Sequence, residues 1–414
     1  MPQITVPFYR PDLQPPEIQE VLAVLQSGWL TTGPRVQRFE REFADAVHAK
    51  HAVALNSCTA ALHLAVHVLG LRPGDGVLVP SLTFAATAEV VRYEGGIPVL
   101  VDCDPVTLNM DLAHAAGVIE RLQQGEQVAG LPRHTRVVGM IPVHVGGVMM
   151  DIAAVSAFAT DHGLWVVEDA AHAFPAAWRP TQDAPWQACG QHTSAVTCFS
   201  FYANKTITTG EGGMAVTDSD ELAAQMRLMS LHGLSHDAWG RYSGTGTWDY
   251  RIMAPGYKYN LTDIAAAIGI HQLARAEAMR QAREDIALEY LARLSDIESL
   301  ELPAVVPDRV HAWHLFPIRL RLEGMAMDRN AFISALRDQG VASSVHWRPL
   351  HLHPYYTATF GWQPADVPSA STEWPRLISL PLFSSMRRDE IDAVVTAVRA
   401  VCDRAVRAPL VEAE

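Results

Sequence analysis

The segment 199–205, followed by the glycine-rich stretch 210–213, places a lysine directly behind an apolar run. Residues 196–201 predict a buried strand that ends in a polar turn. A lysine at such a position can lose its charge, and a neutral amine is a nucleophile able to form a Schiff base. Ser200 would place a hydroxyl on an anion near Lys205. The alternative is a lysine that extends to solvent beside a strand serine, and this segment alone leaves both open.

A second candidate is the turn 56–59, between a predicted strand at 52–55 and a predicted helix. At a strand–turn–helix junction, free backbone N–H groups and the positive end of the helix dipole converge, which favours a phosphate. Ser57 and Thr59 would add hydroxyl donors on either side of Cys58. The alternative is that one of these hydroxyls only caps the helix.

Asp169 and His172 follow the predicted strand 164–167, and Phe84 follows the predicted strand 77–79. A carboxylate at the end of a buried strand is costly unless a cation or several donors accompany it. Asp169 is therefore a candidate partner for a bound cation. Its alternative role is an N-cap for a helix from Ala170 onward.

Strands that alternate with helices would position these candidates. The strands are predicted at 52–55, 77–79, 98–101, 137–142, 164–167, 196–201 and 214–216, and helices at 17–26, 35–49, 83–93, 151–162 and 219–231. This alternation predicts an α/β fold with a mainly parallel central sheet covered on both faces. Ligands of such sheets bind at the carboxyl ends of the strands, where all three candidates fall.

The pattern changes after about Gly233. Residues 236–253 predict a long surface loop, and long loops are often functional. A long helix at 262–294, a strand at 312–322, a helix at 328–340, a second strand near 345–348 and a helix at 388–406 then predict a smaller α+β domain. We expect a large domain at 1–254 and a small domain at 255–414.

Composition excludes several classes of partner. The net charge of −13 disfavours nucleic acid, and the five cysteines show no paired close spacing, as expected of reduced thiols in the cytoplasm. No signal peptide and no run of 18 apolar residues is found, so we expect no membrane contact.

Seven sequence blocks occur together in one order, at 39–43, 57–62, 80–87, 142–144, 168–172, 199–205 and 210–213. In this order they resemble the DegT/DnrJ/EryC1/StrS family, fold-type I aminotransferases that act on nucleotide-linked keto sugars. The resemblance covers nearly the whole chain. It implies pyridoxal 5′-phosphate (PLP) joined to Lys205, with amino-group transfer from an amino acid, expected to be L-glutamate, to a sugar ketone.

The resemblance also implies a role for each candidate residue. Asp169 would pair with the pyridinium nitrogen and His172 would lie near the ring hydroxyl, while Phe84 would stack on the ring. Lys205 would also move a proton as general base and acid. The phosphate would be held by Ser57, Cys58, Thr59 and Ser200. Lys258 and Asn260 match a segment that reaches into the partner's site, which implies a homodimer with shared active sites.

Some positions depart from the common family pattern. Cys58 stands where glycine is frequent and His172 where glutamine is frequent, whereas Lys258 and Asn260 stand where asparagine and arginine are more usual. The residues at these positions resemble the pattern of the family branch that aminates UDP-linked 4-keto pentoses. This resemblance indicates a subgroup and not a substrate. Members with histidine at the lysine position catalyse dehydration, so Lys205 favours transamination.

Substrate contacts are expected from loops. Trp29, Thr31 and Trp239, together with His346 and Arg348, could line the cleft and meet a nucleotide or sugar, although a core role for the tryptophans or a surface ion pair for Arg348 is an alternative. A metal site is not favoured, because no carboxylate or cysteine completes the set His311, His314, His346, His351 and His353.

Two other functions remain open from the sequence. A PLP-dependent aminotransferase could act on a non-nucleotide ketone, such as a cyclitol or a small keto acid. A non-catalytic PLP-binding regulatory protein could keep the fold without turnover.

Overall fold

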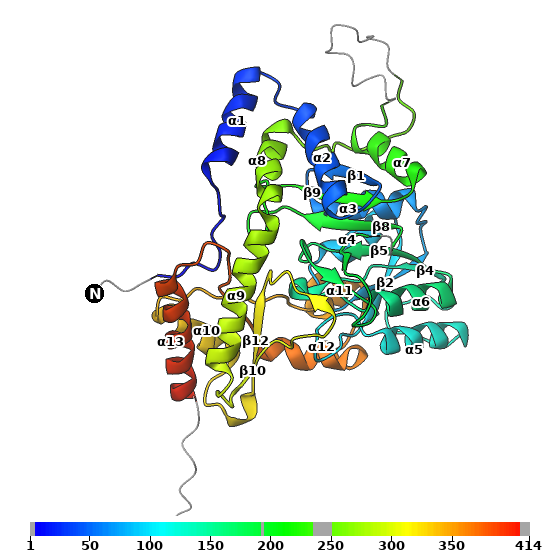
Figure 1. Ribbon diagram of the computed structural model, residues 1–414. Coiled ribbons are helices and arrows are strands. Elements are labelled where there is room, and N and C mark those ends of the chain that lie inside the picture. Colours follow the sequence, from blue (N-terminus) through cyan, green and yellow to red (C-terminus); the bar gives the residue numbers. More distant parts are fainter. Residues whose placement is uncertain (1–4, 192–193, 235–250, 406–414) are drawn as a thin grey trace, which may run out of the picture.

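The computed structural model describes residues 5–191, 194–234 and 251–405, which form a larger and a smaller lobe (Figure 1). The larger lobe is built on a seven-stranded sheet of order β1-β9-β8-β5-β4-β2-β3. Strand β9 is antiparallel to both its neighbours, and the other adjacent strands are parallel. The strands are β1 His51–Leu55, β2 Gly76–Pro80, β3 Ile97–Val101, β4 Val137–Met140, β5 Trp165–Asp169, β8 Val196–Ser200 and β9 Gly213–Thr217. This confirms the predicted α/β class with a mainly parallel central sheet.

Helices connect these strands and cover the sheet. They are α2 Pro34–Ala46, α3 Cys58–Val68, α4 Ala86–Tyr93, α5 Leu112–Gln123, α6 Ile152–His162 and α7 Asp220–Ser230. Several begin at a side chain that accepts a backbone N–H, as Ser57 does for α3 and Ser219 for α7. A short sheet of β11 Arg309–Val310, β6 Ala177–Trp178 and β7 Gln187–Ala188 lies beside the main one.

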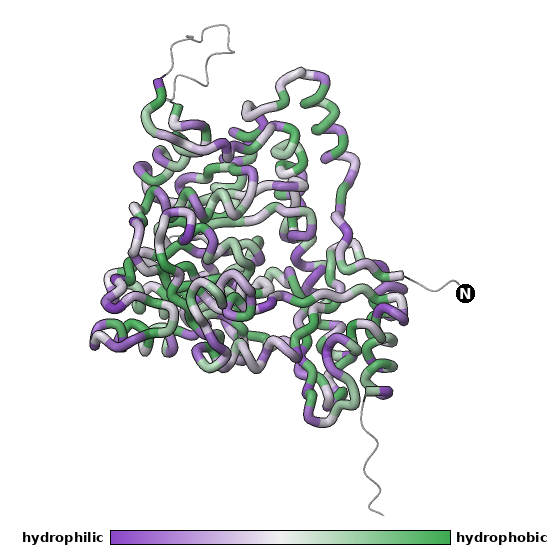
Figure 2. Tube along the Cα trace, turned by 180° about the vertical axis from the view of Figure 1, so that it is seen from behind, coloured by the Kyte–Doolittle hydropathy of each residue, from purple (hydrophilic) through white to green (hydrophobic). Residues whose placement is uncertain are grey.

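Helix α1, Pro15–Ser27, lies along the outside of the larger lobe, as Figures 1 and 2 show from opposite sides. Proline at its start and Gly28 at its end, with φ of 74°, give it the predicted limits. One stripe of this helix, Ile18, Leu22 and Leu25, is at least half exposed. The stripe is therefore apolar surface without a partner in the described chain.

The smaller lobe contains an antiparallel sheet of order β10-β12-β13, with helices packed on it. Its elements are β10 Leu300–Glu301, β12 Phe316–Leu320, α10 Arg329–Asp338, α11 Pro354–Phe360, α12 Pro368–Glu373, β13 Leu377–Leu380 and α13 Arg388–Ala405. The strand predicted near 345–348 is wrong. That segment turns toward the larger lobe, and β13, whose side chains are buried, takes the place in the sheet.

The long helix predicted at 262–294 is two helices, α8 Asp263–Ala274 and α9 Ala276–Leu294. Arg275 separates them, because its backbone is not helical, with φ of −109° and ψ of 3°, and its guanidinium bonds Glu17 of α1 at 2.7 Å. The apolar pattern continues across Arg275, so periodicity alone could not reveal the break.

Each lobe has its own core, and the chain enters both more than once. Val6 lies in the core of the smaller lobe, where its N–H donates to Gly340 and its carbonyl accepts from Ala342. Helix α8 packs in the larger lobe with α2. The domain limits 1–254 and 255–414 remain a prediction. None of the described helices has the length and apolar character needed to cross a membrane.

Candidate active site

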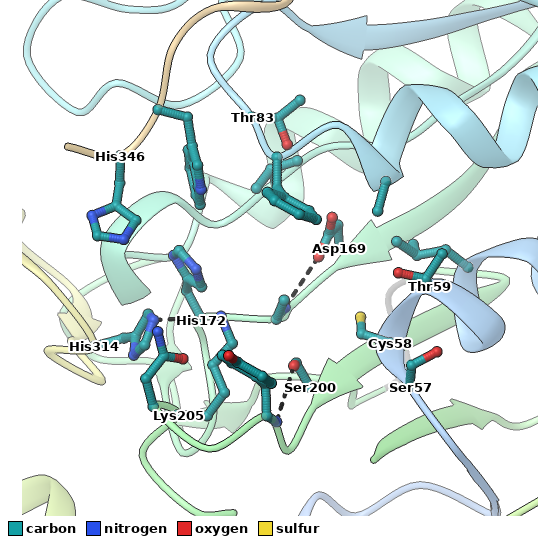
Figure 3. Close-up of a pocket in the computed structure, with 18 of the residues that line it drawn as sticks. Ser57, Cys58, Thr59, Thr83, Asp169, His172, Ser200, Lys205, His314 and His346 are labelled. Carbon is teal, nitrogen blue, oxygen red and sulfur yellow. Dashed lines mark hydrogen bonds between the residues drawn. The ribbon is translucent and has the colours of Figure 1, made fainter. Parts of the chain in front are cut away.

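One pocket of about 350 Å³ lies at the carboxyl edge of the main sheet (Figure 3). Parallel strands bring it together: β1 ends before Ser57, β5 ends at Asp169, and β8 ends at Ser200. The predicted residues that line it are Ser57, Cys58, Thr59, Phe84, Asp169, His172, Ser200, Lys205 and His346. Residues predicted from separate parts of the sequence therefore share one cavity.

Lys205 lies in the turn after β8, and its Nζ is 3.4 Å from Nε2 of His314. Burial lowers the pKa of the amine to about 8, because the charged form loses hydration and the electrostatic interactions with Cys58 and Asp169 compensate only in part. At pH 7 a pKa near 8 leaves roughly a tenth of the amine neutral. The neutral amine is the form that acts as a nucleophile and a base.

Asp169 lies at the end of β5 and is 5% exposed. Its Oδ2 accepts from the Thr87 hydroxyl at 2.8 Å, and its Oδ1 accepts from the Ala171 N–H at 3.2 Å. No helix starts at Ala170, so the N-cap alternative is wrong. Burial raises the pKa of this carboxyl against these donors, as expected of an acid without a paired cation.

The turn at Ser57 begins α3, and the Ser57 Oγ accepts from the Ala60 N–H at 3.0 Å. Ser57 is thus the N-cap, while Cys58 and Thr59 stand in the first turn. Strand β9 starts directly against this turn. A Cβ on Gly213 would lie 2.4 Å from the Ser57 carbonyl carbon and 2.5 Å from the Cys58 nitrogen. Glycine at 213 therefore keeps the backbone of the turn in place.

Gly213→Ala should displace this turn, because the added Cβ meets backbone that cannot rotate away. We expect the free energy of unfolding of the variant to be about 1–3 kcal/mol lower than that of the parent, and its affinity for PLP to be weaker. Urea unfolding and a PLP titration measure the two effects. Gly117→Ala is the matched control, since a Cβ there meets nothing within 4 Å. Stability and PLP affinity of Gly213→Ala equal to those of the parent protein would show that the turn tolerates the side chain.

Histidine rings form the wall opposite this turn. His172 is buried, accepts at Nδ1 from the Gly146 N–H at 3.3 Å, and stacks on Trp347 with ring centres 4.8 Å apart. Burial lowers the pKa of His172 well below its usual range and that of His346 to about 4. Both rings are therefore neutral at pH 7.

The five histidines weighed as metal ligands have other partners. Nδ1 of His346 pairs with the Ser379 hydroxyl, Nδ1 of His351 with the Ser81 hydroxyl and His353 with the Arg348 carbonyl. Nδ1 of His311 accepts from a backbone N–H, and His314 pairs with Lys205. Within the described ranges, one group has three close ligand atoms, His144, Glu168 and Cys189, and it includes none of these five.

Five predicted residues do not line the pocket of this chain. Trp29 donates to the Thr32 carbonyl, Thr31 lies in the same loop between α1 and α2, and Arg348 is exposed with its Nε on the Leu352 carbonyl. Lys258 bonds Asn260, whose amide donates to the Thr32 hydroxyl at 2.7 Å. The predicted loop residue Trp239 lies outside the described residues.

Three residues in or beside the pocket were given no role in the sequence analysis, and a fourth, His314, was weighed only as a metal ligand. Thr87 supports Asp169, while Tyr202, Asn204 and His314 line the cavity. Thr87 follows Thr83 by four residues, and their hydroxyls pair at 2.8 Å. His314 is brought to Lys205 only by tertiary folding.

The model of the DegT/DnrJ/EryC1/StrS aminotransferase family matches residues 11–399. The chain belongs to this family. A spore coat polysaccharide biosynthesis protein, SpsC of Bacillus subtilis, is 44% identical over 397 residues, 96% of this chain and 97% of that protein. The family makes the protein a PLP-dependent aminotransferase, as predicted from the sequence.

Two solved structures share the architecture. A Streptococcus pneumoniae protein solved in its PLP form is 30% identical, with a TM-score of 0.83 over 97% of this chain and 99% of that one. The sugar aminotransferase CalS13 of Micromonospora echinospora is 29% identical, with a TM-score of 0.79 over 95% of this chain and 99% of that one.

The pocket of this family member fits PLP. It offers an amine for a covalent bond, a buried acid without a paired cation, and the hydroxyl-bearing start of a helix. Two buried polar atoms beside it, Oδ1 of Asn204 and Nδ1 of His314, have no hydrogen-bonding partner among the described residues. The pocket is therefore pre-formed and offers polar atoms without partners among the described residues, as expected of a site that receives a charged cofactor.

Proposed function

We propose that the protein transfers an amino group from L-glutamate to a keto group of a nucleotide-linked sugar, with PLP held on Lys205. The observation that carries this proposal is that Lys205 and Asp169 line one pocket together with the Ser57 turn. The amine of Lys205 has a lowered pKa and the carboxyl of Asp169 a raised one. A PLP ring would suit both, because its aldehyde would react with the amine and its protonated nitrogen would pair with the carboxylate.

Several side chains would hold the cofactor. Asp169, fixed by Thr87 and the Ala171 N–H, would accept from the pyridinium nitrogen. Phe84, 61% exposed at the pocket mouth, would stack on the ring, and His172 would lie near its hydroxyl. The phosphate would rest on Ser57, Cys58, Thr59 and Ser200 at the start of α3.

PLP, when bound, withdraws electrons from the substrate carbon beside the amino group, and that weakens the C–H bond there. Nζ of Lys205 would take up this proton from the substrate carbon and deliver it to the cofactor carbon on the other side of the amino nitrogen, acting as base and then as acid. The lowered pKa of Lys205 suits both roles near neutral pH. The neutral rings of His172 and His346 line the same cavity without adding positive charge.

A sugar substrate is supported by the relatives, since CalS13 is a sugar aminotransferase and SpsC belongs to polysaccharide biosynthesis. We infer a nucleotide-linked sugar and L-glutamate from the family resemblance. His346 lines the pocket of this chain and is the candidate for sugar contact. Trp29, Thr31 and Arg348 would contribute from loops outside this cavity.

We also infer a cytoplasmic homodimer with shared active sites. The exposed stripe of α1, with Ile18 57% and Leu22 and Leu25 each 50% exposed, is an apolar surface suited to a second copy. Lys258 and Asn260, which are outside the pocket of their own chain, would serve the pocket of the partner. Sedimentation equilibrium at micromolar concentration would reveal a monomer if this inference is wrong.

A substrate panel tests the proposed reaction. With L-glutamate as donor, we expect turnover with at least one nucleotide-linked keto sugar and none with free cyclitol ketones or small keto acids. Loss of the visible absorbance on adding L-glutamate alone is expected, because only a competent first half-reaction changes the cofactor. If only free ketones are aminated, the proposed nucleotide-sugar substrate is wrong and a free ketone takes its place. If the absorbance stays unchanged with every amino donor, a non-catalytic PLP-binding protein is favoured.

A further inference from the structure

His314 lies in the pocket, and neither the sequence pattern nor the family description gives it a role. It precedes β12 in the smaller lobe, is 5% exposed, and its Nε2 is 3.4 Å from the Lys205 Nζ (Figure 3). Its second nitrogen, Nδ1, is buried without a partner among the described residues. Within the described part of the chain, the ring therefore has one hydrogen bond, the one to Lys205.

The backbone that carries His314 is fixed on both sides of the residue. The Ala312 N–H donates to Gly147 at 3.0 Å, and the Leu315 N–H donates to Gly146 at 3.1 Å. Gly147 has φ of 104°, and a Cβ there would lie 3.2 Å from the backbone nitrogen of His314. The backbones of the two segments are therefore in close contact, with no side chain between them. This contact leaves the imidazole little freedom of position.

The charges around His314 keep its ring neutral. Arg283 is buried without a carboxylate partner in the described chain and donates to the Trp313 carbonyl at 3.3 Å. Burial first, and then electrostatic interactions with His172, Lys205 and Arg283, lower the pKa of His314 well below its usual range. A neutral ring can accept a hydrogen bond from Lys205 without removing its proton.

We propose that His314 is a positioning residue for Lys205: its Nε2 accepts a hydrogen bond from Nζ and holds the amine in place whenever it is not bonded to the cofactor. A lysine side chain is a flexible chain of four carbons. If its amine is held in place before the reaction, the entropy cost of ordering it does not add to the reaction barrier. The ring of His172, 4.1 Å from that of His314 between centres, supports it from the other side. This inference rests on the proposed role of Lys205.

Two substitutions separate positioning from space filling. Glutamine can place a polar atom where Nε2 lies, whereas asparagine reaches only as far as Nδ1. His314→Gln should therefore keep the contact with Lys205, and His314→Asn should lose it. Both variants are polar and no larger than histidine, so they serve as a matched pair.

The reactivity of Lys205 in the cofactor-free protein gives the readout. Labelling with acetic anhydride from pH 6 to 10, followed by peptide mass spectrometry, gives the pKa of Lys205, with Lys50 as internal standard. In His314→Asn we expect this pKa to fall by about one unit, because a buried ammonium loses its acceptor. In His314→Gln it should stay within about 0.3 units of the parent value. The other titratable groups facing the amine, Cys58, Asp169, His172 and His346, are the same in both.

In the loaded enzyme we expect His314→Asn to lower kcat about ten-fold with an unchanged KM for the amino donor, and His314→Gln to recover most of it. Equal pKa values of Lys205 in both variants and the parent would overturn the proposal, as would equal shifts in both. Should a variant fail to fold, the ¹⁵N shifts of His314 in the parent protein decide: an Nε2 signal that ignores the titration of Lys205 contradicts the contact. Because the labelling uses no PLP, its outcome is separate from whether Lys205 binds the cofactor.

Discussion

Replacing Lys205 by alanine should abolish both the visible absorbance of the PLP-loaded protein and its aminotransferase turnover. The substitution removes the amine that would bond the cofactor and the group that would move the proton, and loss of a proton-transfer group alone lowers rates roughly a hundred- to ten-thousand-fold. Absorbance spectra and a glutamate-dependent amination assay measure the two losses.

Because the chain has few lysines, the position of a covalently bound cofactor can be assigned without ambiguity. Lysine occurs only at positions 50, 205 and 258, so borohydride reduction of the loaded protein followed by peptide mapping has three possible outcomes. We expect the label at 205. Lys50→Ala is the control, because Lys50 pairs with Asp220 on the surface at 2.7 Å. A label on another lysine, or turnover that survives in Lys205→Ala, would end the proposed role of this residue.

Asp169→Asn should leave PLP bound but slow amino transfer on the order of a hundred- to a thousand-fold. The amide keeps the shape of the side chain and can still accept from Thr87, but it has no negative charge to hold a proton on the pyridine nitrogen. Stopped-flow measurement of the glutamate half-reaction isolates this step from sugar binding.

Asp161→Asn is the control for this change, because Asp161 is an exposed acid near the end of α6. The same one-charge change there should leave the half-reaction unaltered. If Asp169→Asn keeps a rate within about three-fold of the parent, the carboxylate does not act on the cofactor, and its buried position would need another explanation.

Much of the larger lobe could be predicted because its strands are short apolar runs bounded by turn residues. The strand predicted at 77–79 is β2 at Gly76–Pro80, and the one predicted at 98–101 is β3 at Ile97–Val101. Because the carboxyl ends of parallel strands lie at the same edge of a sheet, candidates at strand ends could be predicted to lie close together. Lys205, Asp169 and the Ser57 turn lie in one pocket for this reason.

What failed depended on contacts between distant residues. The helix breaks at Arg275, whose side chain bonds the distant Glu17, and β13 takes its place in the sheet by pairing with β12. His314 was weighed only as a metal ligand, because nothing local in its sequence points to Lys205, more than a hundred positions earlier. Such features follow from the packing of the lobes, which periodicity does not encode.

The position of Val6 has a consequence for how the chain reaches its native state. This residue leaves the ribosome long before Gly340 and Ala342, yet its two backbone bonds join it to them. Pairing across so many residues is slow, since the entropy of closing the loop must be overcome first. The segment around Val6 therefore cannot form these two bonds until residues 340–342 have been synthesised, and the smaller lobe gains this backbone contact only then.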